Sequence, residues 1–151
     1  MAVNIDRQRL VLGGLAAGVV LNIIDFFSNG VIFASRMQAD ANAFKPGLGD
    51  QMAAMGGGQI AVYVFFDFVI GFLLVWTYAA MRPRFGPGPR TAVYASLVFF
   101  VVGLITTFGY KEMGVMSTGL WWSYTALWFI NLVVAALVGA AVYREDGPAT
   151  V

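Results

Sequence analysis

Residues 10–34 read LVLGGLAAGVVLNIIDFFSNGVIFA, and Asp25 is the only charged side chain in this long apolar run. About 20 mostly apolar residues allow a helix to cross the roughly 30 Å hydrocarbon core of a bilayer. Three more apolar runs follow at 60–81, 92–110 and 120–143. None of the four runs shows the two-residue alternation of hydrophobicity that is typical of membrane barrel strands. The sequence therefore predicts an all-α polytopic integral membrane protein, a four-transmembrane-helix antiparallel bundle forming one membrane domain over 1–151.

The composition excludes most soluble and catalytic classes. Of the residues, 60% are hydrophobic and 11% are charged. In soluble domains roughly 45–50% of the residues are apolar and about 25% are charged. The net charge of +1 leaves no basic surface for nucleic acid. The chain contains no Cys and no His, which removes disulfides, thiolate chemistry and imidazole ligands. We expect no cofactor and no enzymatic activity; an enzyme acting on a lipid or quinone is a weaker alternative, because no nucleophile or metal cluster is recognisable.

The basic residues predict the orientation of the spans, because Lys and Arg are enriched in cytoplasmic segments. With the N-terminus inside, the cytoplasmic segments carry six basic residues and the outer segments three: Arg7, Arg9, Arg82, Arg84, Arg90 and Arg144 against Arg36, Lys45 and Lys111. We therefore expect both termini to be cytoplasmic. The segment RPRFGPGPR, residues 82–90, is predicted to form a tight cytoplasmic hairpin whose prolines and glycines prevent the helix from continuing.

The longest segment between the predicted spans, residues 35–58, is expected to form an outer loop. Its small, polar and Met residues are compatible with one short surface helix near 49–55, ended by the glycines at 56–58, or with a plain solvated loop. Small residues at 39–41 are similar to a signal-peptide cleavage site. The preceding apolar run is too long for a signal peptide and contains Asp25, so we expect no cleavage.

Two aspartates are predicted to lie at the same depth in the membrane. The first span is centred near Asn22, which places Asp25 about 4.5 Å toward the outer side at a rise of about 1.5 Å per residue. The second span runs inward and is centred near Ile70, so Asp67 lies about 4.5 Å toward the same side. Aspartates near the middle of a span are costly in lipid and should face the protein interior. Because the central parts of the spans hold no Lys, Arg or His, we expect a coupled pair with at least one carboxyl protonated.

Small and polar residues recur at helical spacing on one face of each predicted span. In the first span, Gly14, Gly18, Asn22, Asp25 and Asn29 follow at steps of four, four, three and four. Small residues let helix backbones approach closely inside a membrane. We expect close packing at Gly14, Gly18, Gly71, Gly103, Ala135 and Gly139, with a homodimer contact at Gly14 and Gly18 as an alternative. The polar candidates for an inner site are Asp25, Asp67, Asn22, Asn29, Asn131, Thr107 and Tyr63.

This polar set is compatible with three roles. Carboxylate and amide oxygens suit proton transfer or a small hard cation, and intramembrane acids commonly mark ion pathways. The same residues can instead hold helices together by hydrogen bonds, or bind a substrate. We predict a proton- or cation-handling protein that forms a homo-oligomer, because four short helices enclose little room for a pathway. The alternative is an accessory or scaffold subunit of a larger membrane complex, with no chemistry of its own.

Two segments resemble those of small uncharacterised bacterial membrane proteins with four helices: GGLAAGVVLNIIDFFSNGVIFAS at 13–35 and YAAMRPRFGPGPRTAVYA at 78–95. The shared first-helix pattern is Asn-Ile-x-Asp/Glu-Phe-x-x-Asn-Gly, which falls here on Asn22, Asp25, Asn29 and Gly30. A looser likeness is to the DUF1761 family of four-helix proteins. The resemblance implies a location in the bacterial cytoplasmic (inner) membrane and implies no activity.

Overall fold

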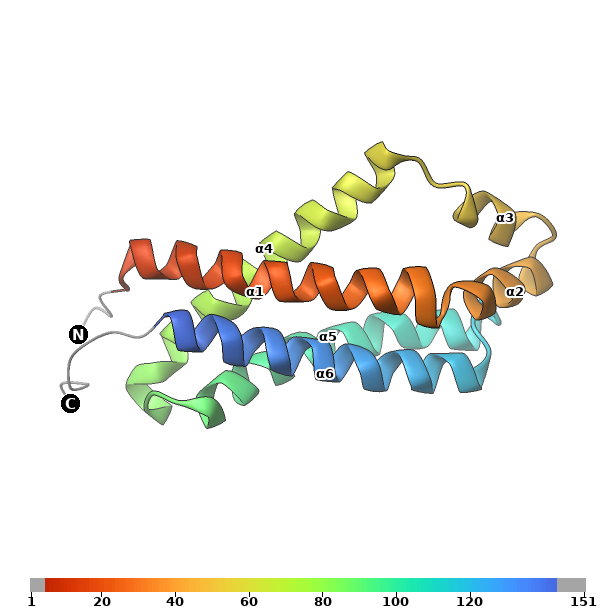
Figure 1. Ribbon diagram of the computed structural model, residues 1–151. Coiled ribbons are helices and arrows are strands. Elements are labelled where there is room, and N and C mark those ends of the chain that lie inside the picture. Colours follow the sequence, from red (N-terminus) through yellow and green to blue (C-terminus); the bar gives the residue numbers. More distant parts are fainter. Residues whose placement is uncertain (1–4, 144–151) are drawn as a thin grey trace.

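The computed structural model describes residues 5–143, which are almost entirely helical (Figure 1). No β-strand is present among these residues, so the all-α prediction is confirmed. In chain order the helices are α1 Arg7–Phe27, the π-helix η1 Ser28–Ile32, α2 Ala34–Phe44, α3 Leu48–Ala53, α4 Gly57–Phe85, α5 Pro89–Glu112 and α6 Thr118–Val142.

Within the described chain, four helical segments are long and apolar enough to cross a membrane, as predicted: Arg7–Ile32, Gly57–Phe85, Pro89–Glu112 and Thr118–Val142. Each begins shortly before the corresponding apolar run. Two of these starts have side-chain caps, since Asp6 accepts a hydrogen bond from the Arg9 amide and Ser117 accepts one from the Leu120 amide. Figure 1 shows that α1 begins and α6 ends at the same end of the bundle. These features fit a multi-pass membrane protein.

Glycine contacts bring α1 close to both α4 and α6. A Cβ atom added at Gly71 of α4 would lie 2.5 Å from the Gly18 nitrogen and 2.7 Å from the Gly14 carbonyl oxygen. A Cβ atom added at Gly139 of α6 would lie 3.1 Å from the Gly13 carbonyl oxygen. Close approach of this kind is how membrane helices gain packing contacts. The face that carries Gly14 and Gly18 is therefore occupied by α4 of the same chain.

The remaining small residues expected at helix contacts also lie between helices. Gly103 of α5 faces the ring of Trp128 on α6, and Ala135 of α6 is fully buried. The core around them is built mainly from α1, α4, α5 and α6 and includes Leu21 and Leu132. Because the small residues admit large neighbours, the core combines close backbone contacts with well-packed side chains.

The two halves of α4 have different surroundings. In the second half, Leu74 and Val75 are fully buried in the core. In the first half, all residues from 57 to 66 are exposed. Figure 1 shows α4 crossing α1 and then diverging from it toward α3. The glycine contact at Gly71 is thus the point at which α4 joins the bundle.

Residues 35–58 differ from the expected loop, because they contain most of α2 and all of α3. Of the two alternatives left open by the sequence, α3 matches the short helix near 49–55, and α2 is not expected from the sequence. A turn at Gly47 joins the two helices, and its φ of +83° favours glycine. Asp40 Oδ2 accepts a hydrogen bond of 2.7 Å from the Ser117 amide, which connects α2 to the start of α6.

Side-chain hydrogen bonds hold α2 against α3. Asp50 Oδ1 accepts hydrogen bonds from Gln38 Nε2 at 2.9 Å and from Asn42 Nδ2 at 3.2 Å. Asn42 Oδ1 accepts one from the Gly49 amide at 2.7 Å. The hydrogen bonds from Gln38 and Asn42 hold the pKa of Asp50 below its usual range. These contacts connect residues up to twelve positions apart, which is why no local pattern predicts the first helix.

We expect the contact between α2 and α3 to weaken in acid. Because the folded pKa of Asp50 is lowered, its carboxylate stabilises this contact above the unfolded pKa of about 3.9, and the contribution is lost as the pH falls through the folded pKa. Hydrogen exchange at the Gly49 amide, corrected for the intrinsic rate, should therefore speed up below pH about 4. Asp50→Asn should remove this pH dependence. Identical profiles for the two proteins would contradict the prediction.

The hairpin predicted at 82–90 is shorter than expected, because α4 continues through Pro83 to Phe85. Pro83 removes one backbone hydrogen bond from the final turn but does not end the helix. The helix ends at Gly86, whose φ of +79° favours glycine. The following helix, α5, starts at Pro89, a favoured first position for proline.

Candidate functional site

A hydrogen bond between α1 and α6 marks the centre of the candidate site. Asn131 Nδ2 donates to Asp25 Oδ1 at 2.7 Å. Asn131 is fully buried, and within the described chain its Oδ1 atom has no hydrogen-bond partner. An unmet buried acceptor is costly, so the amide oxygen favours a donor or a cation beside it. The amide therefore serves the carboxyl on one side and offers a free acceptor on the other.

Asp67 of α4 is the second carboxyl at this site. It is half-buried and close enough to Asp25 for a direct charge–charge interaction. The sequence contains no Lys or Arg at 10–35, 46–81, 91–110 or 112–143, so no basic residue lies in the central parts of the spans beside the pair. Two carboxyls that share a desolvated site favour a state in which a proton or a cation reduces their repulsion.

Tyr124 of α6 also lies in this cluster. It is not among the site residues predicted from the sequence. Its hydroxyl lies near the Asn29 side chain and within electrostatic range of both aspartates. Its ring packs against that of Phe33, with 5.8 Å between centroids. The available signal is its spacing, because Tyr124 lies seven residues before Asn131 on the same helix face.

The π-helix η1 positions Asn29 near the carboxyls. Asn29 Nδ2 donates to the backbone carbonyl of Asp25 at 3.0 Å, and Ser28 Oγ donates to the Ile24 carbonyl at 2.6 Å. Short π-helical segments within α-helices are frequent at functional sites. Here the wider turn displaces the residues after Asp25 relative to a regular helix. This local geometry follows from hydrogen bonds that hydropathy does not encode.

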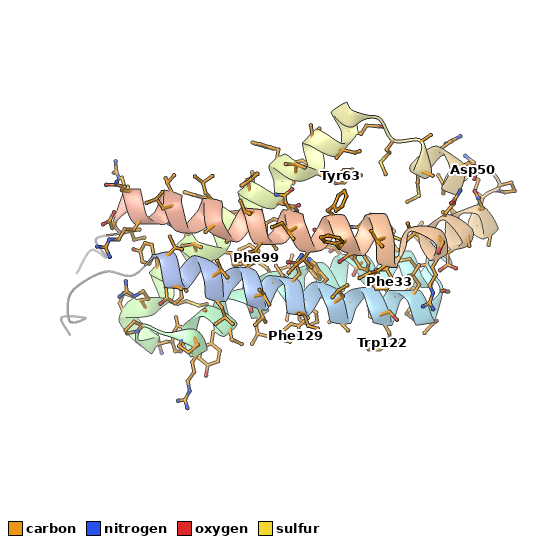
Figure 2. The ribbon with its side chains drawn as sticks, in the orientation of Figure 1. Phe33, Asp50, Tyr63, Phe99, Trp122 and Phe129 are labelled. Atoms are coloured by element: carbon orange, nitrogen blue, oxygen red, sulfur yellow. The ribbon has the colours of Figure 1, made fainter. Side chains whose placement is uncertain are left out.

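The other three polar candidates lie outside this cluster. Asn22 bridges helices, since its Nδ2 donates to the Gly18 carbonyl at 2.9 Å and to the Val64 carbonyl at 3.4 Å. Thr107 donates to the Gly103 carbonyl of its own helix at 2.8 Å. Tyr63 is 60% exposed, on the first half of α4 that diverges from α1 (Figure 2). The structure thus brings together Asp25, Asp67, Asn29 and Asn131 with Tyr124, and leaves Thr107 and Tyr63 apart.

The site holds oxygen and amide groups only. Residues 5–143 contain no group of three or more His, Cys, Asp or Glu side chains that could hold a metal ion. Two acids, two amides and a phenol can exchange protons by hydrogen bonding. The chain therefore combines four helices that are long and apolar enough to span a membrane with an acidic polar cluster between them. No family model, curated protein or solved structure matches the chain.

Proposed function

We propose that this chain is a small protein of the bacterial inner membrane that handles protons through Asp25 and Asp67. The observation that carries the proposal is the unaccompanied pair of carboxyls, with Asn131 hydrogen-bonded to one of them and holding a buried free acceptor. The basic residues support an orientation with both termini in the cytoplasm. We infer that the protein assembles as a homo-oligomer, because four helices enclose little space for a pathway.

A proton fits this site better than a cation does. Two carboxyls can share one proton, which relieves their repulsion and keeps a donor in the cluster. A hard cation favours about six or more oxygen ligands, and the side chains gathered here are two carboxyls, the amides of Asn29 and Asn131 and the Tyr124 hydroxyl. Intramembrane acids without a basic partner are typical of proton pathways. The experiment below also tests whether a cation is transported instead of a proton.

The test measures proton flux into liposomes that contain the full chain. The vesicles enclose a pH-sensitive dye and are driven by a potassium gradient with valinomycin. We expect wild-type protein to acidify the lumen faster than protein-free vesicles do. Asp25→Asn should lower this flux about a hundredfold, because the amide cannot carry a proton. Asparagine retains an oxygen that can accept the Asn131 hydrogen bond, so the fold should persist.

Asp50→Asn is the matched control, because it makes the same change at a carboxyl in α3, outside the spans. Its flux should equal that of the wild type. Wild-type flux no greater than that of empty vesicles would overturn the proposal. A flux that appears only with Na⁺ or K⁺, and not with protons, would replace the proton by a cation as the transported species.

The exposed first half of α4 favours a second candidate function. Residues 57–66 are all exposed and include several large apolar side chains, such as Phe65 and Phe66. An accessory or scaffold subunit of a larger complex would cover such a surface with a partner. Native mass spectrometry of gently extracted protein distinguishes the two. A stoichiometric foreign subunit favours the accessory function, and a homo-oligomer favours proton handling.

A further inference from the structure

An open apolar groove lies where the end of α5 meets the start of α6. Its volume is about 420 Å³, and its lining residues are Leu104, Ile105, Phe108, Lys111, Trp121 and Trp122. Figure 1 shows this end of the bundle opposite to the end at which α1 begins. In the proposed orientation it is the outer end, where the spans leave the hydrocarbon core. Tryptophans are enriched at this depth in membrane proteins.

The wall of this groove contains a hydrogen-bond donor without an acceptor. Trp121 is 3% exposed, and its Nε1 atom has no hydrogen-bond partner among residues 5–143. Its ring packs edge-on against Trp122 at 4.8 Å and against Phe108 at 5.6 Å between centroids. A buried indole N–H normally finds a partner. The glycerol ester region of a lipid supplies acceptor oxygens at this depth.

One charged side chain, Lys111, lines the groove, and its ion-pair partner Glu112 lies beside it outside the lining. Lys111 Nζ lies 4.7 Å from the centroid of the Phe108 ring and contacts the Glu112 carboxylate. The Lys111 side chain is mostly covered, whereas that of Glu112 is exposed. An exposed ion pair contributes little to stability, so a ligand can replace or extend it. A cation beside an anion is complementary to a phosphate beside an ammonium group.

We propose that this groove binds a phospholipid with an ammonium headgroup of the ethanolamine type. One acyl chain lies along Leu104 and Ile105, the phosphate contacts Lys111, and the ammonium contacts Glu112. A lipid with an uncharged glycerol headgroup satisfies Lys111 but places its net negative charge beside Glu112. The inference rests on the membrane location given under the proposed function and does not depend on Asp25 or Asp67.

The test uses quenching of tryptophan fluorescence by lipids with brominated acyl chains. The full chain is reconstituted in phosphatidylcholine with equal mole fractions of brominated ethanolamine, glycerol or choline phospholipid. We expect the ethanolamine lipid to bind about fivefold more strongly than either of the others, because only its primary ammonium group can donate charge-assisted hydrogen bonds to Glu112. Lys111→Gln should weaken the binding of all three lipids, because each carries a phosphate, and Lys111→Arg should retain wild-type binding.

Two further variants make the test specific. Glu112→Gln should reverse the preference, so that the glycerol lipid binds more strongly than the ethanolamine lipid. Lys45→Gln changes a basic residue at the end of α2 that does not line the groove, and should leave the preference unchanged. Equal quenching by the three lipids in wild-type protein would overturn the proposal, as would an ethanolamine preference that survives Glu112→Gln or lipid binding that Lys111→Gln leaves unchanged. Because Asp25→Asn should not alter lipid preference, failure here is distinguishable from failure of proton handling.

Discussion

Replacing Gly71 with alanine should destabilise the bundle by about 1–3 kcal/mol, the usual cost of overpacking a well-packed core. The added Cβ atom would meet the Gly18 nitrogen at 2.5 Å and the Gly14 carbonyl oxygen at 2.7 Å. Both are backbone atoms, so no side-chain rotation relieves the contact and α4 must move away from α1. The free energy of unfolding in mixed micelles, followed by circular dichroism, measures the effect.

Gly109→Ala is the matched control for this prediction. A Cβ atom at Gly109 of α5 would meet no atom within 4 Å. The same change there should be neutral or stabilising by about 0.5–1 kcal/mol, because alanine favours a helix more than glycine does. If Gly71→Ala were as harmless as Gly109→Ala, the close backbone contact between α1 and α4 would be wrong.

The same contact also positions the candidate site. Asp25 lies seven residues after Gly18, and Asp67 lies four residues before Gly71. Both carboxyls are therefore close to the point at which α4 joins the bundle, before α4 diverges from α1. We infer that the separation of the carboxyls depends on the absence of side chains at these glycines. A variant that separates α1 from α4 should weaken both the fold and the proton exchange.

The spans could be predicted from sequence because a helix that crosses a membrane must be mostly apolar along its whole length. Continuous apolar runs identify the four long helices, and their polar and small residues recur at the spacing of one helix face. Depth in the bilayer then relates Asp25 to Asp67, because a helix rises by a constant amount per residue. The partner of Asp25 on α6, Asn131, belongs to the predicted polar set because it shares one helix face with Ala135 and Gly139.

Other features depend on contacts that no local pattern contains. Helix α2 is held by hydrogen bonds to Asp50 from residues eight and twelve positions away. The passage of α4 through Pro83 depends on its place in the final turn, where one missing hydrogen bond is tolerated. The separation of Thr107 from the carboxyls reflects helix order around the bundle, since hydropathy predicts an inner face but not which helix lies opposite.

Asp67→Asn should lower proton flux about a hundredfold, as Asp25→Asn does, because each carboxyl exchanges its proton with the other. The flux of the double variant Asp25→Asn/Asp67→Asn should be no lower than that of the single variant with the lower flux. When two groups act as a unit, removing either one removes the whole contribution to the flux, so the second substitution costs nothing more. When they act independently, the two losses multiply. The flux assay in liposomes, with all variants at equal protein density, measures the flux of the two single variants and of the double variant relative to the wild type.

The outcome of this cycle bears directly on the charge–charge interaction between the two aspartates. If the two losses multiply in the double variant, the carboxyls work independently and the shared-proton pair is wrong. If Asp67→Asn alone retains full flux, Asp25 works with Asn131 and Tyr124 without the second carboxyl. A non-additive result, with each variant retaining wild-type helicity and the same free energy of unfolding to within about 0.5 kcal/mol, would support a shared proton that couples the carboxyls of α1 and α4.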